Sequence, residues 1–134
     1  MPLSYEIDEE QKLLTIIADD RLTYDDVIAH QKELLSEPRL KPGLRCLVDL
    51  TGIKTFAMSG RDMFRLAQVR GEYPYLATNA RTAIVVKNGA MFAMARMYAL
   101  SRRKYIEPMA IFYSLDEARQ WLLQEQIRNE SGSL

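Results

Sequence analysis

Residues 44–62, LRCLVDLTGIKTFAMSGRD, combine a strand, a loop and the start of a helix. The segment LRCLVDL is almost continuously apolar, which is typical of a strand with both faces covered. We expect this strand to end at Asp49 and TGIKTFAM to form a loop. Ser59 precedes Asp62 by three positions, the spacing of a helix capping box. A helical stripe follows, made of Met63, Leu66, Ala67 and Arg70.

The chain before this β-α unit predicts a hairpin and a helix. Leu3–Ile7 and Leu13–Ala18 are strand-like, with the polar residues Asp8 to Gln11 between them. Thr23 and Asp26 then have capping-box spacing. The stripe that follows predicts a helix ending before Pro38, and it consists of Tyr24, Val27, Ile28, Gln31, Leu34 and Leu35.

The chain after the unit repeats the alternation of strand and helix. RTAIVVK predicts a buried strand, NGAMFAMARMYALSRRKY a helix, and MAIFY a core strand. Ser114 and Glu117 form the clearest capping box and start a last helix, in which Trp121 and Leu122 face inward. RNESGSL has nothing to bury and predicts a frayed tail.

The resulting order, β-β-α-β-α-β-α-β-α, is typical of an α/β domain with right-handed crossovers. We predict one domain over residues 1–127 and a flexible C-terminal tail over 128–134. The domain has a five-stranded, mostly parallel sheet with an N-terminal hairpin and four helices.

Composition narrows the classes of function. The 134 residues include 18 Lys and Arg against 18 Asp and Glu, so no chain-wide field favours nucleic acid, and we expect none as a partner. The weakly charged run from Asn88 to Ser101 is too short to span a bilayer. A single cysteine, Cys46, excludes an intramolecular disulfide and fits the cytoplasm.

The residues of common catalytic sites are missing. His30 is the only histidine, so the usual zinc sets and nucleophilic triads cannot be assembled, and we expect it on a helix surface. We predict no metal, no cofactor and no enzymatic activity.

The element order, the stretch LVDLTGIKTFAMSGRD and the segments YEIDEEQKLLTI, Ala95-Arg96-Met97-Tyr98 and IFYSLDEARQWL resemble the SpoIIAA-like family of small bacterial proteins, which is related to STAS domains. The resemblance implies a regulatory domain that acts through protein–protein interaction. The best known members are switched by phosphorylation of a serine in a D-S-S/T-G motif. Here the matching stretch is Ala57-Met58-Ser59-Gly60, so Ala57 replaces the acidic residue and Met58 takes the phosphoacceptor position.

Ser59 has two interpretations, a helix N-cap or a phosphorylation or ligand site, because a phosphate there would meet a helix N-terminus. The carboxyl ends of the strands are where open α/β sheets bind ligands. We therefore predict a switch or partner loop at Asp49, Thr51, Lys54 and Ser59, in which Asp49 either accepts backbone hydrogen bonds or holds a partner's cation.

A second branch of the resemblance is similar to CRAL-TRIO domains and implies a lipophilic ligand. At helical spacing, one face of residues 91–105 carries Met91, Met94 and Tyr98, which form either solid core or an apolar ligand wall. The other face is either solvated or a membrane or partner surface, and it comprises Phe92, Arg96, Arg102, Arg103 and Lys104.

Two functions follow. The first is a non-enzymatic, cytoplasmic binding or regulatory domain with a protein partner, and a homodimer is one form of this. The alternative is a module that binds a lipophilic ligand and associates with the anionic inner face of the membrane.

Overall fold

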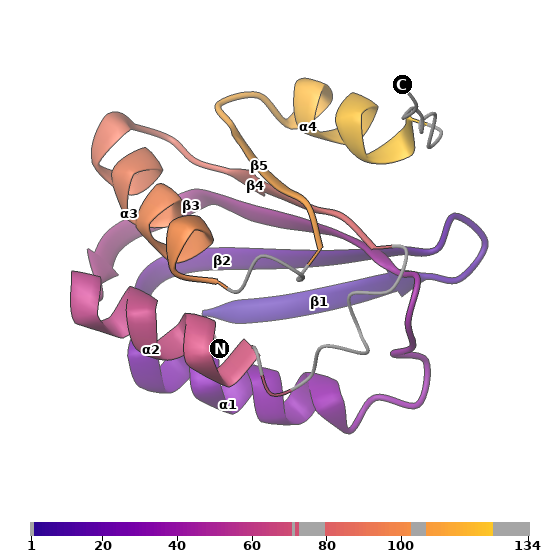
Figure 1. The fold of residues 1–134 in the computed structure, drawn as a ribbon, viewed down its shortest axis with the longest axis horizontal. Helices are drawn as coiled ribbons and strands as arrows, with labels where there is room; N and C mark the ends of the chain where they lie inside the picture. Colours follow the sequence, from indigo (N-terminus) through magenta and orange to yellow (C-terminus); the bar gives the residue numbers. More distant parts are fainter. Residues whose placement is uncertain (1, 71, 73–79, 103–106, 125–134) are drawn as a thin grey trace.

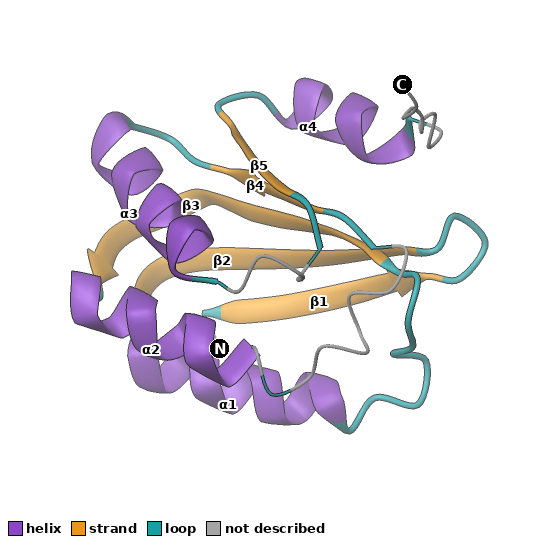
Figure 2. Ribbon diagram, viewed as in Figure 1, coloured by secondary structure: helices purple, strands orange, loops and turns teal. Residues whose placement is uncertain are grey.

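The computed structural model describes residues 2–70, 72, 80–102 and 107–124, and within them five strands form one sheet with four helices on its two faces (Figures 1 and 2). The predicted element order is confirmed. The proposed tail, 128–134, lies outside the described residues. The elements are β1 (Leu3–Asp8), β2 (Leu13–Thr23), α1 (Tyr24–Leu35), β3 (Arg45–Ala57), α2 (Gly60–Arg70), β4 (Thr82–Val85), α3 (Gly89–Ser101), β5 (Met109–Phe112) and α4 (Leu115–Leu123).

The strands lie in chain order, β1-β2-β3-β4-β5, with β1 antiparallel to β2 and all later neighbours parallel. Crossovers of one hand that step in one direction across a sheet place their helices on one face. Accordingly α1, α2 and α3 cover one face, whereas α4 lies on the other, over β3, β4 and β5 (Figure 1).

The helix starts follow the capping residues in the sequence. The Thr23 hydroxyl accepts the Asp26 N–H, and the Asp26 carboxylate accepts the Thr23 N–H in return. Ser59 and Asp62 form the same reciprocal pair at α2. At α4 the Ser114 hydroxyl accepts the Glu117 N–H over 3.2 Å. Each cap satisfies backbone donors that the first helical turn leaves without a partner.

The prediction that β3 ends at Asp49 is wrong, because the strand continues through the expected loop to Ala57. Two register shifts against β2 interrupt it, and each inserts one residue into β3, as β-bulges do. The Asp49 carboxylate accepts the Thr51 N–H over 2.9 Å and holds the first bulge. A Cβ at Gly52 would collide with Asp19 Oδ1, so the Asp19 side chain of β2 occupies the space beside this glycine. These bulges interrupt the alternation of apolar and polar residues that predicts a strand.

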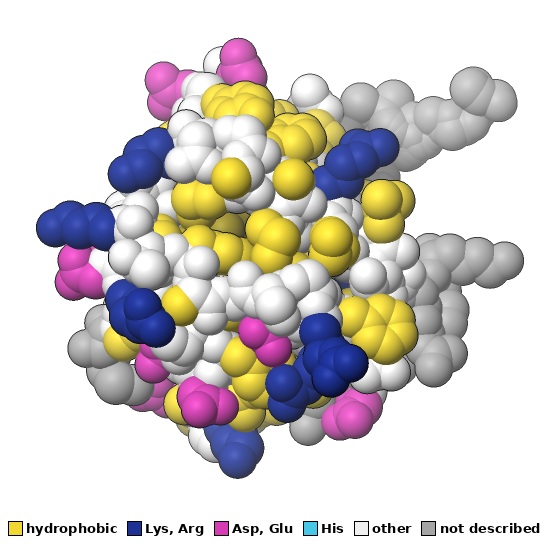
Figure 3. Space-filling model, turned by 90° about the vertical axis from the view of Figure 1, so that its left-hand side faces the viewer, with side chains coloured by type: hydrophobic (Ala, Val, Ile, Leu, Met, Phe, Trp, Pro, Cys, Tyr) yellow, Lys and Arg dark blue, Asp and Glu magenta, His cyan; other side chains and the backbone are white. Residues whose placement is uncertain are grey.

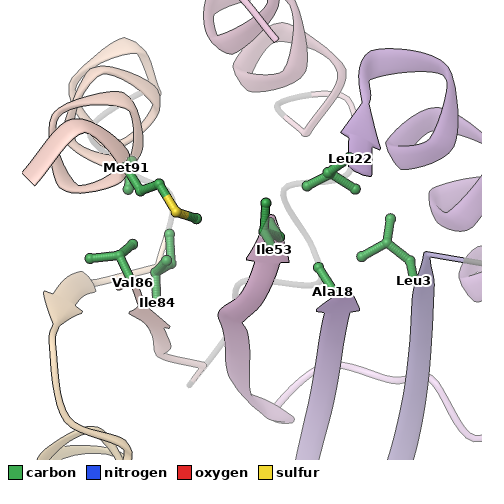
Figure 4. Packing of buried hydrophobic residues seen from close by; sticks show 8 residues of the cluster. Leu3, Ala18, Leu22, Ile53, Ile84, Val86 and Met91 are labelled. Atoms are coloured by element: carbon green, nitrogen blue, oxygen red, sulfur yellow. The ribbon is translucent and has the colours of Figure 1, made fainter. Parts of the chain in front are cut away.

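Two apolar clusters form on the two faces of the sheet. On the α4 face, Leu47, Ala83 and Val85 pack against Ala118 and Leu122, and all are at most 1% exposed. On the other face, Figure 4 shows side chains of the strands and Met91 of α3 around a common space. The buried residues of the first cluster are almost fully enclosed, whereas five of the eight in the second also line the cavity described next: Leu3, Leu22, Ile84, Met91 and Ala95.

No helix in the described part of the chain is long and apolar enough to cross a membrane.

Candidate ligand cavity

A cavity of about 280 Å³ lies between the sheet and helices α1, α2 and α3. Its floor comes from the strands and its walls from the three helices, and most of its lining is apolar. This volume is roughly twice that of a ~150 Å³ apolar cavity that takes up benzene, and it approaches the lower limit of ~300 Å³ for small-molecule sites. The space is therefore large enough for an apolar ligand.

The position of α2 explains the cavity. Its main packing partner is α3, not the sheet. Met63 and Leu66 of α2 are only 3% and 6% exposed, and both line the cavity. The α2 helix thus acts as a roof, and the cavity is the space beneath it.

The floor is built from register-matched rows of side chains. Leu14, Cys46, Thr82 and Met109 are neighbours across four strands, and all four line the cavity. Cys46 lies in a central strand and is nevertheless partly accessible, because its side chain lines the cavity. Burial, with a smaller contribution from the charge of Glu107, raises the pKa of the thiol from 9.0 to about 12. Cys46 is therefore a neutral part of the floor and not a thiolate nucleophile.

One end of the cavity is polar and centres on Glu107, which is 7% exposed. Arg70 Nη2 donates to Glu107 Oε1 over 2.9 Å, and the Thr82 hydroxyl donates to Oε2 over 2.8 Å. Arg102 Nη1 lies 3.5 Å from the same Oε1, and Arg102 Nη2 donates to the Glu107 carbonyl oxygen over 3.0 Å. Arg70, Thr82 and Glu107 line the cavity, so its end wall is an ion-pair network.

Two further titratable side chains line the cavity. Burial raises the pKa of the Tyr98 hydroxyl to about 12, so this group is a neutral hydrogen-bonding group at physiological pH. Burial lowers the pKa of His30, whose ring meets that of Tyr5 edge to face at 5.7 Å. The expectation that His30 lies on the helix surface is wrong, since the residue is 4% exposed.

Two of the three residues of the predicted ligand wall lie at the cavity. Met91 and Tyr98 line it, together with Ala95 from the same face of α3. Met94 is partly buried and is not among the lining residues. Met91 belongs to the buried core cluster and also lines the cavity, as Tyr98 does, so their role as a ligand wall stays a prediction.

The described members of the predicted membrane or partner face differ in exposure. Phe92 is partly buried and stacks on Tyr113 at 5.4 Å, whereas Arg96 is exposed. Arg102 is not a solvated cation, because its side chain is 8% exposed and pairs with Glu107. Arg103 and Lys104 lie outside the described residues. Membrane association stays a prediction, without Arg102 as a contributor.

The residues of the predicted switch or partner loop lie in three places. Asp49 and Thr51 lie within β3 at the first bulge. Asp49 accepts a backbone hydrogen bond from Thr51, which agrees with the first of the two roles predicted for it, that of a backbone acceptor. Lys54 is exposed and lies 3.8 Å from Asp20 in an ion pair. Ser59 is exposed at the start of α2. These residues do not form one polar loop at the strand ends.

The face at the carboxyl ends of the parallel strands is apolar in its middle and carries Lys and Arg interspersed with Asp and Glu around it (Figure 3). Phe56 and Met58 lie at this end, are partly exposed, and also line the cavity. The cavity therefore extends from the carboxyl ends of the strands to the Glu107 network at their amino ends.

Sequence reasoning missed the polar end of the cavity. Arg70 gave a signal, because its spacing from Met63, Leu66 and Ala67 places a cation in the apolar stripe of α2. A charge on the buried side of a helix predicts a buried partner. Glu107 gave no such signal, since it precedes a strand and belongs to no periodic pattern.

Comparisons with known proteins identify the fold. No protein-family model and no curated protein matches the sequence. A solved structure is similar: an uncharacterized protein from the DUF3478 family with a SpoIIAA-like fold, from Shewanella loihica PV-4. The two are 16% identical, with a TM-score of 0.57 over 90% of this chain and 91% of the other. The chain therefore has a SpoIIAA-like fold, as its sequence predicted.

Proposed function

We propose that the protein binds an elongated apolar small molecule in the cavity between the sheet and helices α1, α2 and α3. The observation that carries this proposal is the cavity itself, a space of about 280 Å³ lined mainly by apolar side chains. Burial of apolar ligand surface contributes about 25 cal/mol per Å², which favours such a molecule over a polar one.

The flexible side chains around the space support the same proposal. Met58, Met63, Met91 and Met109 all line the cavity. Methionine is unbranched and polarisable, so it adapts to ligands of varying shape. The lining resembles the adaptable surfaces of proteins that accept several apolar partners.

An Ala95→Phe variant tests the cavity directly. Ala95 is 6% exposed and lines the space, so a phenyl ring there occupies the volume that the ligand needs. We expect wild-type protein to bind the neutral fluorescent probe N-phenylnaphthylamine, and the variant to bind it at least about ten-fold more weakly. Fluorescence titration measures both affinities.

Stability measurements on the same variants separate a cavity from a solid core. Extra volume in a filled core costs about 1–3 kcal/mol, whereas a cavity accepts it without loss. Urea unfolding should therefore show Ala95→Phe to be at least as stable as wild type. The control is Ala93→Phe, the same change at an exposed position of α3. The proposal would be refuted if Ala95→Phe were less stable than wild type and the wild-type protein did not bind the probe.

A second candidate function is protein binding through α2 and α3. Phe64 on α2 is 51% exposed, and Met97 and Leu100 on α3 are 44% and 73% exposed. These three side chains, the α2–α3 apolar surface, lie on helices that pack against each other. Exposed apolar groups on neighbouring elements support an interaction site.

The simplest partner for the α2–α3 apolar surface is a second copy of the chain. We expect sedimentation velocity to show a dimer at micromolar concentration, and the variant Phe64→Ser/Leu100→Ser to be monomeric. Leu123→Ser, at a 48% exposed position of α4, is the control and should remain dimeric. A wild-type protein that is monomeric at every accessible concentration would remove self-association through this surface.

A further inference from the structure

We propose that the bound molecule is uncharged and carries one oxygen acceptor, such as a carbonyl group, to which the Tyr98 hydroxyl donates a hydrogen bond at the Glu107 end of the cavity. Its apolar chain fills the remainder of the space. This inference rests on the proposed function and adds to it the chemistry of the ligand's polar group and the direction in which the ligand lies.

The first argument is that the Tyr98 hydroxyl lines the cavity and has a proton to donate. No hydrogen bond joins this hydroxyl to another group in the described part of the chain. Among the described residues, the polar side-chain atoms that lack both a partner and accessible surface are His30 Nε2, Arg102 Nε and Arg102 Nη1. The Tyr98 oxygen is not one of them, so a small molecule can reach it.

The exposure and the pKa of Tyr98 together indicate that its hydroxyl faces the cavity. The side chain is only partly buried, so it keeps accessible surface. Burial is nevertheless the main reason why the pKa of the hydroxyl rises to about 12. Both observations agree when the accessible surface faces the space that Tyr98 lines. A hydroxyl in this position is costly to leave without an acceptor, and a bound ligand supplies one.

The second argument is that this position disfavours an anion. Burial raises the pKa of Tyr98 to about 12, with a smaller contribution from Glu107, although the charges of Arg102 and Arg70 lower it. A negative oxygen here therefore loses more from desolvation than it gains from the two cations. A ligand carboxylate beside the hydroxyl would be desolvated in the same way, whereas a neutral carbonyl oxygen loses much less hydration.

The third argument concerns the charged side chains of the lining. Glu107 accepts hydrogen bonds from Arg70 and from the Thr82 hydroxyl. Among the described lining residues, the remaining charged one is Lys41, which is exposed in the segment between α1 and β3. The Tyr98 hydroxyl thus offers a hydrogen bond from a neutral group, beside charges that already have partners.

The rest of the lining indicates the direction of the ligand. Tyr98 lies near Glu107 and Cys46, whose charges act on its pKa, and Cys46 is itself a neutral thiol. Phe56 and Met58 lie at the opposite end, near the carboxyl ends of the strands. A molecule whose oxygen meets Tyr98 therefore extends its apolar chain toward Phe56 and Met58.

Three ligands of the same size test the inference in wild-type protein. 2-Nonanone, octanoate and 2-methyl-1-nonene share a heptyl chain, which ends in a ketone, a carboxylate and a hydrocarbon group respectively. Displacement of N-phenylnaphthylamine gives the affinity of each. We expect 2-nonanone to bind more tightly than octanoate at pH 7.

The outcomes separate the inference from the proposed function. Failure of wild-type protein to bind the probe and all three ligands overturns both. Tighter binding of octanoate than of 2-nonanone overturns the inference alone. Loss of that advantage in Lys41→Met would then place the anionic group at Lys41.

The variant Tyr98→Phe tests the role of the hydroxyl. It keeps the ring, so 2-methyl-1-nonene should bind as in wild type, whereas 2-nonanone should bind about 3- to 10-fold more weakly through the loss of one neutral hydrogen bond. Tyr113→Phe is the matched control, at a 59% exposed position that does not line the cavity, and should change neither affinity. An equal change for both ligands in Tyr98→Phe, or no change for 2-nonanone, overturns the inference and leaves the apolar cavity function intact.

The infrared absorption of bound 2-nonanone detects the hydrogen bond in wild-type protein and does not depend on the folding of a variant. A hydrogen bond lowers the stretching frequency of a carbonyl group. We expect the carbonyl band of the bound ketone to lie at a lower frequency than that of the ketone in hexane. A band at the hexane frequency overturns the inference.

Discussion

Replacing Glu107 with Gln is expected to destabilise the protein by about 3–5 kcal/mol, because it removes the carboxylate charge between two buried guanidinium groups. Glu107 is 7% exposed, and the side chains of its partners Arg70 and Arg102 are 18% and 8% exposed. Breaking a buried ion pair costs far more than the pair contributes, since the remaining charge stays desolvated. Urea unfolding followed by circular dichroism measures the change.

Asp20→Asn is the control for a surface ion pair. Asp20 and Lys54 are 3.8 Å apart with side chains that are 77% and 81% exposed, so the loss should be under about 1 kcal/mol. Asn also tolerates the positive φ of 60° at this position. Similar losses in Glu107→Gln and Asp20→Asn would mean that the Glu107 network does not stabilise the fold through buried charge.

The Glu107 network also shows where prediction from sequence ends. The strands and helices could be predicted because they depend on local signals, such as the capping pairs Thr23 with Asp26 and Ser59 with Asp62. The ion pairs to Glu107 join residues that are 37 and 5 positions away, and nothing in the local pattern specifies them. Only the position of Arg70 in an apolar stripe indicated that a buried partner was needed.

The strand β3 shows a different limit. Its continuation from Asp49 to Ala57 requires two bulges, with Asp49 bonded to Thr51 and Gly52 closely packed against β2. Bulges interrupt the period of two on which strand prediction depends. The polar residues in this segment therefore favoured a loop, although they belong to a paired strand.

From the sequence, the cavity could be predicted only as one of two alternatives, the other being a solid core. Periodicity places Met91 and Tyr98 on the inner face of α3, and the same pattern fits a solid core and a hollow one. The outcome depends on how far α2 stands from the sheet, which is a property of tertiary packing. The dense opposite face shows that this chain can fill a core, and thus that the space beneath α2 is a local feature.

Replacing Leu122 with Ala tests that difference between the two faces. Leu122 is 0% exposed and packs from α4 onto Leu47 and Val85, so removing its side chain leaves a cavity in a filled region. We expect a loss of about 2–5 kcal/mol in the free energy of unfolding, measured with urea.

The neighbouring residue provides the matched control for this prediction. Leu123 is 48% exposed on the same helix, so Leu123→Ala should change stability by no more than about 0.5 kcal/mol. N-phenylnaphthylamine binding should be unchanged in both variants below their unfolding transitions, because Leu122 lies on the opposite face of the sheet from the cavity. A small loss in Leu122→Ala would contradict a densely packed α4 face. Loss of probe binding in a folded Leu122→Ala protein would show that the two faces of the sheet are coupled. The cavity beneath α2 would then depend on side-chain packing on the opposite face, with which α2 has no contact.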